Sequence, residues 1–174
     1  MTAYHDHEWG RPAGSDVDLF ERLILESFQA GLSWSTILRK RESFRQAFRG
    51  FDPVVVAAFN DADRARLMAD AGIVRNRAKI DAAIGNAAAF IAVGEAFGGF
   101  ASYLASIVTD APRPLPIGAA IPASTPASIA LSKDLLARGF RFVGPTITYA
   151  FMQSVGLVDD HVPGCFRYRD DRSS

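Results

Sequence analysis

Leu25-Glu-Ser-Phe-Gln-Ala-Gly-Leu-Ser-Trp34 is the stretch on which our prediction of the fold rests. Its first half continues an amphipathic helix that starts after Ser15, and its second half is a turn. Residues spaced by three or four positions share one face of a helix. Glu26 shares such a face with Leu19, Leu23 and Ala30. The spacing therefore predicts that Glu26 points into the protein.

A carboxylate at this position needs a partner, because burying an isolated charge is costly. The partner can be structural, such as backbone amides or an arginine, and perturbed acids are often of this kind. It can also be a ligand. An inward acid followed, after the break at Gly31, Leu32 and Ser33, by Trp34 suggests a pocket for a flat molecule with hydrogen-bond donors. The pattern leaves both interpretations open.

Length and composition indicate one globular domain. The chain has 174 residues, of which 49% are hydrophobic, and this excludes a disordered chain. The 19 basic and 19 acidic residues give a net charge of zero, which argues against nucleic-acid binding by bulk charge but allows local basic patches. No apolar run suggests a membrane span, and the polar start argues against a signal peptide. Because Cys165 is the only cysteine, we expect a cytoplasmic protein without an internal disulfide. We also expect a monomer.

The rest of the chain predicts helices, and no segment shows the alternation of a strand, so we expect an all-α fold. Periodicity and capping residues place helices at about 16–30, 33–48, 53–59, 61–71, 78–97, 100–108, 128–138 and 146–155. The segment 110–126 carries five prolines and is expected to be a surface loop. Residues 140–143 are expected to form an extended apolar connection. We expect the whole chain, 1–174, to form a single unit.

Two basic features suggest contact with phosphate. The helix at 33–48 and its end carry five cations, for which a solvated face and a phosphate-facing surface are both possible: Arg39, Lys40, Arg41, Arg45 and Arg49. The turn from Gly72 to Lys79 joins two predicted helices and forms a helical hairpin near 61–97. Its backbone amides lie near a helix N-terminus and can hold a phosphate. An ordinary surface turn is the alternative.

His161 and Cys165 are four residues apart across a Pro-Gly turn, a spacing that suits zinc. A tetrahedral structural site needs four ligands, and this pair supplies two. His5 and His7 are the remaining histidines, and one of them can supply a third ligand. A turn without metal is the alternative.

Several motifs, in order along nearly the whole chain, resemble bacterial 3-methyladenine DNA glycosylase I. They are Tyr4-His5-Asp6 with Glu8-Trp9-Gly10, Leu25-Glu26 with Gln29 to Trp34, Asp70-Ala71-Gly72-Ile73, Gly139-Phe140 with Phe142-Val143-Gly144, and Asp160-His161 with Gly164-Cys165. The resemblance implies a helix-hairpin-helix DNA glycosylase fold with a terminal zinc-binding segment, where the N- and C-terminal segments meet. It also implies a monofunctional enzyme of base excision repair that hydrolyses the N-glycosidic bond of 3-methyladenine in alkylated double-stranded DNA.

The resemblance implies roles for individual residues. Glu26 is the carboxylate that reads the base, and Tyr4 and Trp34 are the aromatic walls of its pocket. The residues implied at the DNA surface are Gly31 and Leu32, together with a hairpin that holds phosphate through Gly72, Arg75, Arg77 and Lys79. The implied ligands of a structural zinc ion are His5, His161 and Cys165.

This sequence departs from the family pattern at two places. The family's fourth zinc ligand is a cysteine upstream of the position of His5, and this chain has none, so we expect three protein ligands completed by water or by His7. Pro145 stands where the family commonly has a small polar residue. Many superfamily members also use an aspartate beyond the hairpin, but the span from Ala82 to Thr109 has Glu95 as its only acid. A good leaving group makes that aspartate less necessary.

Two other functions compete with the enzyme. A non-catalytic helix-hairpin-helix protein would keep the hairpin and lose the acid or the stacking aromatics, whereas Tyr4, Glu26 and Trp34 are all present. A zinc-stapled helical interaction module without a nucleic-acid partner fits the neutral net charge but not the basic helix and hairpin.

Overall fold

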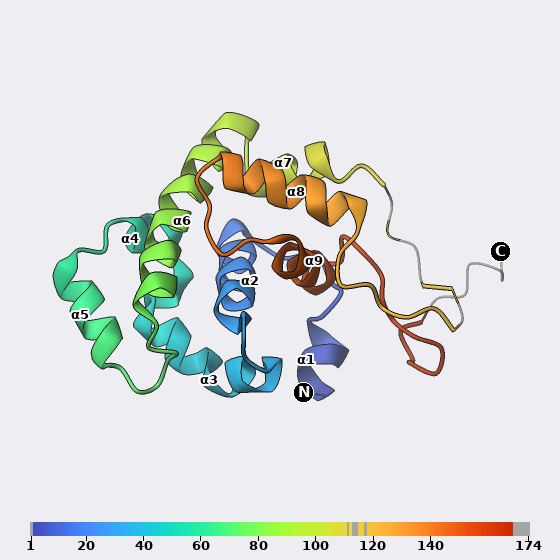
Figure 1. Ribbon diagram of the computed structural model, residues 1–174, viewed down its shortest axis with the longest axis horizontal. Helices are drawn as coiled ribbons and strands as arrows, with labels where there is room; N and C mark the ends of the chain where they lie inside the picture. Colours follow the sequence, from blue (N-terminus) through green and yellow to red (C-terminus); the bar gives the residue numbers. More distant parts are fainter. Residues whose placement is uncertain (1, 111, 113–114, 117, 169–174) are drawn as a thin grey trace.

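Helices form the regular structure of this protein (Figure 1). The computed structural model describes residues 2–110, 112, 115–116 and 118–168, and among these it contains no β-strand. In chain order the elements are α1 (Thr2–His7), α2 (Asp16–Gln29), α3 (Trp34–Ala47), the 3-10 helix η1 (Arg49–Phe51), α4 (Pro53–Ala57), α5 (Asp61–Ala69), α6 (Arg77–Phe97), α7 (Phe100–Ile107), α8 (Pro126–Ala137) and α9 (Pro145–Ser154). The predicted all-α class is confirmed.

Helix α2 is the centre of the fold. It packs against α3, α6, α7 and α9, and Figure 1 shows it in the middle of the molecule between α6 and α9. Every residue from Leu19 to Phe28 is buried. The sequence pattern predicted one inward stripe, but neighbours on several sides cover the whole circumference of the helix. Even Glu21 and Arg22 are buried, because both take part in ion pairs.

Phenylalanine rings pack α2 against α3 and η1. Phe28 lies 4.8 Å from Phe44 and 5.8 Å from Phe48 between ring centroids, and all three side chains are fully buried. Aromatic pairs at such distances add to the free energy gained by burying their surface. This cluster fixes the direction in which the chain leaves α2 and enters α3.

Local capping chemistry sets most helix boundaries where the sequence predicted them. The Ser15 hydroxyl accepts from the Asp18 amide at the start of α2, and the Asp52 carboxylate accepts from the Val54 amide at the start of α4. Helix α8 begins earlier than expected, because Thr125 caps it and Ser128 lies inside its first turn. Pro145 occupies the first turn of α9, where a missing amide proton costs nothing.

Helix α1 was not predicted. Its six residues show no apolar periodicity, and none of them is buried. Contacts with distant parts of the chain hold it in place, and no local pattern encodes those contacts. The clearest is the Glu8 carboxylate just after the helix, which accepts from both terminal nitrogens of Arg41 on α3, at 2.6 and 2.7 Å.

Helix α6 is the element that bears on the expectation of no membrane span. Among the described residues it is the one helix that is long and apolar enough to cross a membrane by length and composition. Much of this apolar character comes from alanines, and the helix is a core element that packs against α4, α5 and α7. Core helices pass the same test, so the finding is weak evidence for a membrane span. With α5, this helix forms the predicted hairpin.

Candidate active site

A cavity of about 290 Å³ opens between α1, α2, the start of α3 and α9. Its size lies at the lower end of the range for small-molecule sites. Aromatic and polar side chains line it together with one alanine: Tyr4, His5, Trp9, Glu26, Gln29, Trp34, Ala150 and Gln153. The structure thus brings the predicted trio of Tyr4, Glu26 and Trp34 to a single cavity.

Glu26 is the acidic group of this cavity. Its side chain comes from the buried face of α2, only 4% of the residue is exposed, and its Oε2 atom has no hydrogen-bond partner among the described residues. Burial raises the pKa of the Glu26 carboxyl to about 8. A structural acid would have a protein donor at this oxygen. The carboxyl instead suits a ligand that brings its own hydrogen-bond donor to Oε1, the Glu26 oxygen that is not sealed inside the protein.

Tyr4 and Trp34 form an aromatic corner beside this acid. Their ring centroids lie 5.4 Å apart with an interplanar angle of 52°. Tyr4 comes from α1 and Trp34 from the first position of α3, so two distant segments build the corner. Burial and the nearby Glu26 and Glu8 carboxylates raise the pKa of the Tyr4 phenol above its usual value, so this ring stays neutral. Electron-rich faces next to an acid favour a flat cationic ligand.

Arg41 on the basic helix α3 neither faces solvent nor forms a phosphate-facing surface, the two roles predicted for this helix. The Arg41 guanidinium, with 13% of its side chain exposed, bridges Glu8 and the Glu21 carboxylate, which lies 2.5 Å from its Nε atom. Arg45 also donates to Glu21, at 3.0 Å. The Lys40 ammonium donates to the carbonyls of residues 71 and 72. These cations hold α1, α2 and the hairpin onto α3, and Arg39 and Arg49 are the exposed remainder.

His5, His161 and Cys165 come together from the two ends of the described chain. Their potential ligand atoms all lie within 4.8 Å of one another, and the Nε2 atom of His5 is 3.4 Å from the Cys165 sulfur. His161 is buried, and its Nε2 atom has no partner among the described residues. Carboxylates hold the opposite ring nitrogens, with Asp159 2.6 Å from His161 and Asp6 2.9 Å from His5.

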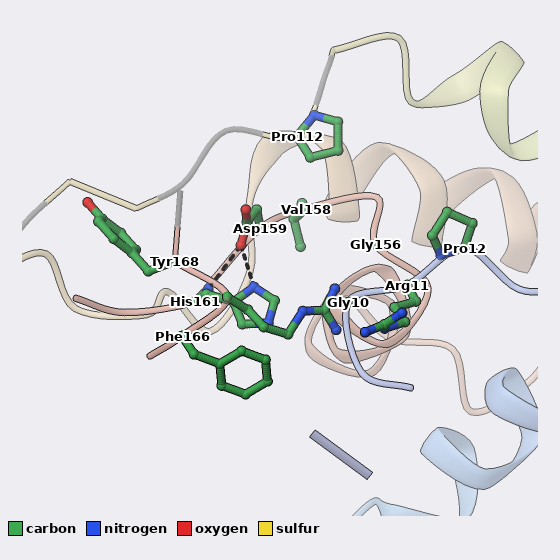
Figure 2. A pocket seen from close by; sticks show the side chains of 11 residues that line it. Gly10, Arg11, Pro12, Pro112, Gly156, Val158, Asp159, His161, Phe166 and Tyr168 are labelled. Carbon is green, nitrogen blue, oxygen red and sulfur yellow. Dashed lines mark hydrogen bonds and ion pairs between the residues drawn. The ribbon is translucent and has the colours of Figure 1, made fainter. Parts of the chain in front are cut away.

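This arrangement fits a zinc ion. Metal-bound histidines commonly donate their second ring nitrogen to a carboxylate, which orients the ring. Figure 2 shows the Asp159 carboxylate bound to both the ring and the backbone amide of His161. A Cβ atom at Gly10 would lie 2.8 Å from the His161 ring, so glycine allows the close approach. His7, the alternative ligand in our prediction, is exposed and lies outside the cluster.

A second hollow of about 900 Å³ adjoins this cluster. Figure 2 shows it between the segment that follows α1 and the C-terminal segment, with Arg11, Asp159 and Phe166 among the side chains around it. Glu26 does not line this larger hollow. We therefore place the candidate active site in the smaller cavity, where the acid and the aromatic corner meet.

The hairpin residues divide into exposed and structural ones. Arg75 and Arg77 are exposed, as the prediction of a phosphate contact requires. Lys79 differs, because it is buried and its ammonium donates to the carbonyls of Phe28 and Ala30, at 2.9 and 2.5 Å. Burial lowers the pKa of this ammonium. The Gly72 amide is also occupied, since it donates to Asp70.

Gly31 and Leu32 form the exposed turn between α2 and α3. Gly31 has a φ of 81°, a conformation in which other residues are strained, and it reverses the chain directly after α2. Leu32 leaves 41% of its surface exposed. Two residues later the chain reaches Trp34 at the cavity, so this turn lies beside the cavity along the chain.

A model of the methyladenine glycosylase family matches residues 1–168 of this chain. The chain belongs to this family. It is 51% identical to DNA-3-methyladenine glycosylase 1 of Escherichia coli (strain K12) over 168 residues, which are 95% of this chain and 90% of that protein. A crystal structure of 3-methyladenine DNA glycosylase I shares 48% identity and a TM-score of 0.91, and covers 97% of this chain and 93% of that one. A structure of a tyrosine-to-phenylalanine variant of 3-methyladenine DNA glycosylase I in complex with 3-methyladenine shares 37% identity and a TM-score of 0.91, over 97% and 92% of the two chains.

In this member of the methyladenine glycosylase family, the cavity is also lined by His5, which was predicted as a zinc ligand, and by four residues that no prediction assigned to it: Trp9, Gln29, Ala150 and Gln153. The aromatic and acidic cluster at residues 4–10 was a usable signal for Trp9. Gln29 lies three residues after Glu26, so the helical period placed both on nearby faces. Nothing in the local pattern of α9 distinguishes Gln153 from a solvated glutamine.

Proposed function

We propose that this chain is a monofunctional DNA glycosylase that excises 3-methyladenine from alkylated double-stranded DNA by hydrolysing the N-glycosidic bond. The observation that carries the proposal is the buried Glu26 carboxyl, which has no hydrogen-bond partner among the described residues and lines a cavity walled by Tyr4 and Trp34. Family membership supports the same activity, and the whole chain acts as one glycosylase unit in base excision repair. Such repair fits the cytoplasm, where Cys165 stays reduced.

The cavity suits the charge of the damaged base. Adenine methylated at N3 is cationic while it is attached to its sugar. Each aromatic face binds such a cationic base more strongly than it binds a neutral base, by about 0.5–2 kcal/mol. The Glu26 carboxylate accepts from the exocyclic amino group, and the positive base favours its ionised form over the protonated form that burial favours. Glu26 therefore recognises and orients the base.

The base must leave the duplex to reach this cavity, at a cost of a few kcal/mol that is smallest for damaged bases. In our proposal, Gly31 and Leu32 enter the space that the extruded nucleotide leaves. Arg75, Arg77 and the backbone amides at the start of α6 hold a phosphate, while Lys79 supports this contact from inside the protein. This supporting role replaces the direct DNA contact that the sequence suggested for Lys79.

Bond cleavage depends mainly on the leaving group. The positive charge of the base weakens the glycosidic bond, and water attacks the sugar as the base departs. The one acid between Ala82 and Thr109 is Glu95, which is exposed and lies outside the lining of the cavity. No lysine lines the cavity, so cleavage of the DNA strand through a Schiff base is not part of the proposal.

The single experiment that tests the function is incubation with methylated duplex DNA, followed by chromatography of the released free bases. The wild-type protein is expected to release 3-methyladenine. Glu26→Gln is expected to slow release by about a hundredfold, the size of effect seen when one well-placed electrostatic group is removed from an active site. Glu95→Gln, which changes an exposed acid, serves as the control. Binding of the methylated DNA without any release would favour the non-catalytic alternative.

A structural zinc ion is a second part of the proposal. His5, His161 and Cys165 would hold it, and water would complete the tetrahedron. The ion would cross-link α1 to the C-terminal segment and would take no part in the reaction. Metal analysis of the purified protein is expected to find one zinc ion per chain, and His161→Gln is expected to lose it. A fully folded wild-type protein without zinc would contradict this part and leave the proposed reaction intact.

A further inference from the structure

Gln153 on α9 lines the same cavity as Glu26 on α2, and nothing in the proposed function uses it. An amide has two unlike ends, a carbonyl oxygen that accepts and a nitrogen that donates. The end that faces a bound base decides which bases can bind. The surroundings of Gln153 fix this orientation.

Asp160 holds the nitrogen end of the amide. The residue is 5% exposed, and its Oδ2 atom accepts from Gln153 Nε2 at 2.5 Å and from the Tyr149 hydroxyl at 2.7 Å. An ionised carboxylate accepts and does not donate. If the amide were reversed, two acceptor oxygens would face each other at this short distance. The orientation therefore follows from the chemistry of Asp160.

The carbonyl end of Gln153 consequently points away from Asp160. Oxygen and nitrogen are separate substituents of one planar carbon and point in different directions, so the nitrogen contact directs Oε1 elsewhere. Among the described residues Oε1 has no hydrogen-bond partner, and it is absent from the polar atoms that are sealed inside the protein. Gln153 thus offers the cavity an accessible acceptor.

We propose that Gln153 is a specificity-determining residue, whose carbonyl oxygen accepts a hydrogen bond from the exocyclic amino group of the base, and that Asp160 is the positioning residue that keeps it turned this way. This inference rests on the proposed function. An adenine amino group has two protons, one for Glu26 and one for Gln153. Guanine carries an oxo group at the same ring position, so its oxygen would face the Gln153 oxygen. The pair of acceptors thus selects methylated adenine against methylated guanine.

Three variants test this arrangement. Gln153→Met keeps the approximate size and removes the acceptor. Asp160→Asn provides a donor to the amide, so Gln153 can reverse and present its nitrogen to the base. Tyr149→Phe is the matched control, because it removes the other donor to Asp160 and leaves the contact with Gln153. Thermal melting and zinc content identify variants that have lost the fold or the neighbouring His161 site.

The readout is the ratio of kcat/KM for release of 3-methyladenine to that for 3-methylguanine, from DNA that contains both. Polar atoms left without partners make such discrimination large, so Gln153→Met is expected to lower the ratio by about tenfold through slower release of 3-methyladenine. Asp160→Asn is expected to lower it further by also speeding release of 3-methylguanine. Tyr149→Phe is expected to keep the wild-type ratio.

An unchanged ratio in folded Gln153→Met would overturn the proposal, and this variant alone decides if Asp160→Asn does not fold. A wild-type protein that releases no base would refute the proposed function separately. In that case, calorimetry with free 3-methyladenine and free 3-methylguanine still tests Gln153. The wild type is then expected to prefer 3-methyladenine, and Gln153→Met to lose most of that preference. Equal preferences in the two proteins would refute the role of Gln153.

Discussion

Glu26 and Tyr4 face one cavity, but different forces hold the helices that carry them. Glu26 belongs to α2, where every residue from Leu19 to Phe28 is buried against neighbouring helices. Tyr4 belongs to α1, which buries none of its own residues. Ion pairs at Glu8 and the cluster around His161 hold α1 in place. One wall of the cavity is thus part of the hydrophobic core, and the other is attached to it by polar contacts.

Stability of the fold and recognition of the base are therefore separable in this protein. A change in the core should alter the free energy of unfolding of the whole protein, because α2 contacts most of the fold. A change in the contacts of α1 should mainly alter the cavity. The three predictions that follow run from the largest expected change in stability to the smallest.

Phe28→Ala is expected to give the largest effect. It removes a fully buried ring that packs against Phe44 and Phe48 and leaves a cavity in the core. Large-to-small changes of this kind cost about 3–5 kcal/mol. Urea denaturation followed by circular dichroism measures the loss. A loss below about 1 kcal/mol would mean that α2 is not the centre of stability.

Glu26→Gln is expected to change how stability depends on pH. The pKa of the Glu26 carboxyl is raised from 4.5 to about 8, so the folded state holds this proton more tightly than the unfolded state. The resulting stability is complete below pH 4.5 and is lost as the pH rises through 8. Glutamine does not titrate, so the variant should be more stable than wild type by about 1–3 kcal/mol near pH 9.

Melting curves from acid to alkaline pH measure this difference between Glu26→Gln and wild type. Glu95→Gln provides the control, because Glu95 is exposed and its replacement should leave the pH profile unchanged. Parallel profiles for wild type and Glu26→Gln would show that the cavity is wetter than its geometry indicates.

Glu8→Gln is expected to change overall stability least, by about 1 kcal/mol. The amide oxygen keeps one hydrogen bond from Arg41, whereas the amide nitrogen cannot accept the second, and the charge of the pair is lost. The effect should concentrate in α1. Hydrogen exchange should speed up in the amides of α1 and stay slow in α2, and the KM for methylated DNA should rise several-fold with a smaller change in kcat. Glu42→Gln is the matched control, since Glu42 is an exposed acid on α3. Equal exchange in α1 of both variants would show that the pair with Arg41 does not anchor the helix.

The same contrast explains what the sequence could predict. Helix α2 was found because its apolar residues recur with the helical period and Ser15 caps its start. Helix α1 was missed because its main anchors lie far away in the chain, as with Glu8 and Arg41, which are 33 residues apart. Such pairs leave no local signature.

The candidate site shows the same division between local and distant information. The period of α2 predicted the buried position of Glu26 from the residues alone. The family resemblance was needed to join Tyr4 to Trp34 and to choose His5 over His7 as the partner of His161. Neither route anticipated that Lys79 turns inward, because a long side chain on a surface turn usually reaches solvent.

The inward Lys79 ties the hairpin to the end of α2. Its ammonium, at the start of α6, binds the two carbonyls that end α2, and the next residue is Gly31. These two hydrogen bonds therefore hold the hairpin and the turn at the cavity at a fixed distance from each other. In the proposed complex, the protein would hold one phosphate and inspect one nucleotide. The protein would fix the distance between them along the DNA strand, and that distance would not depend on the base sequence.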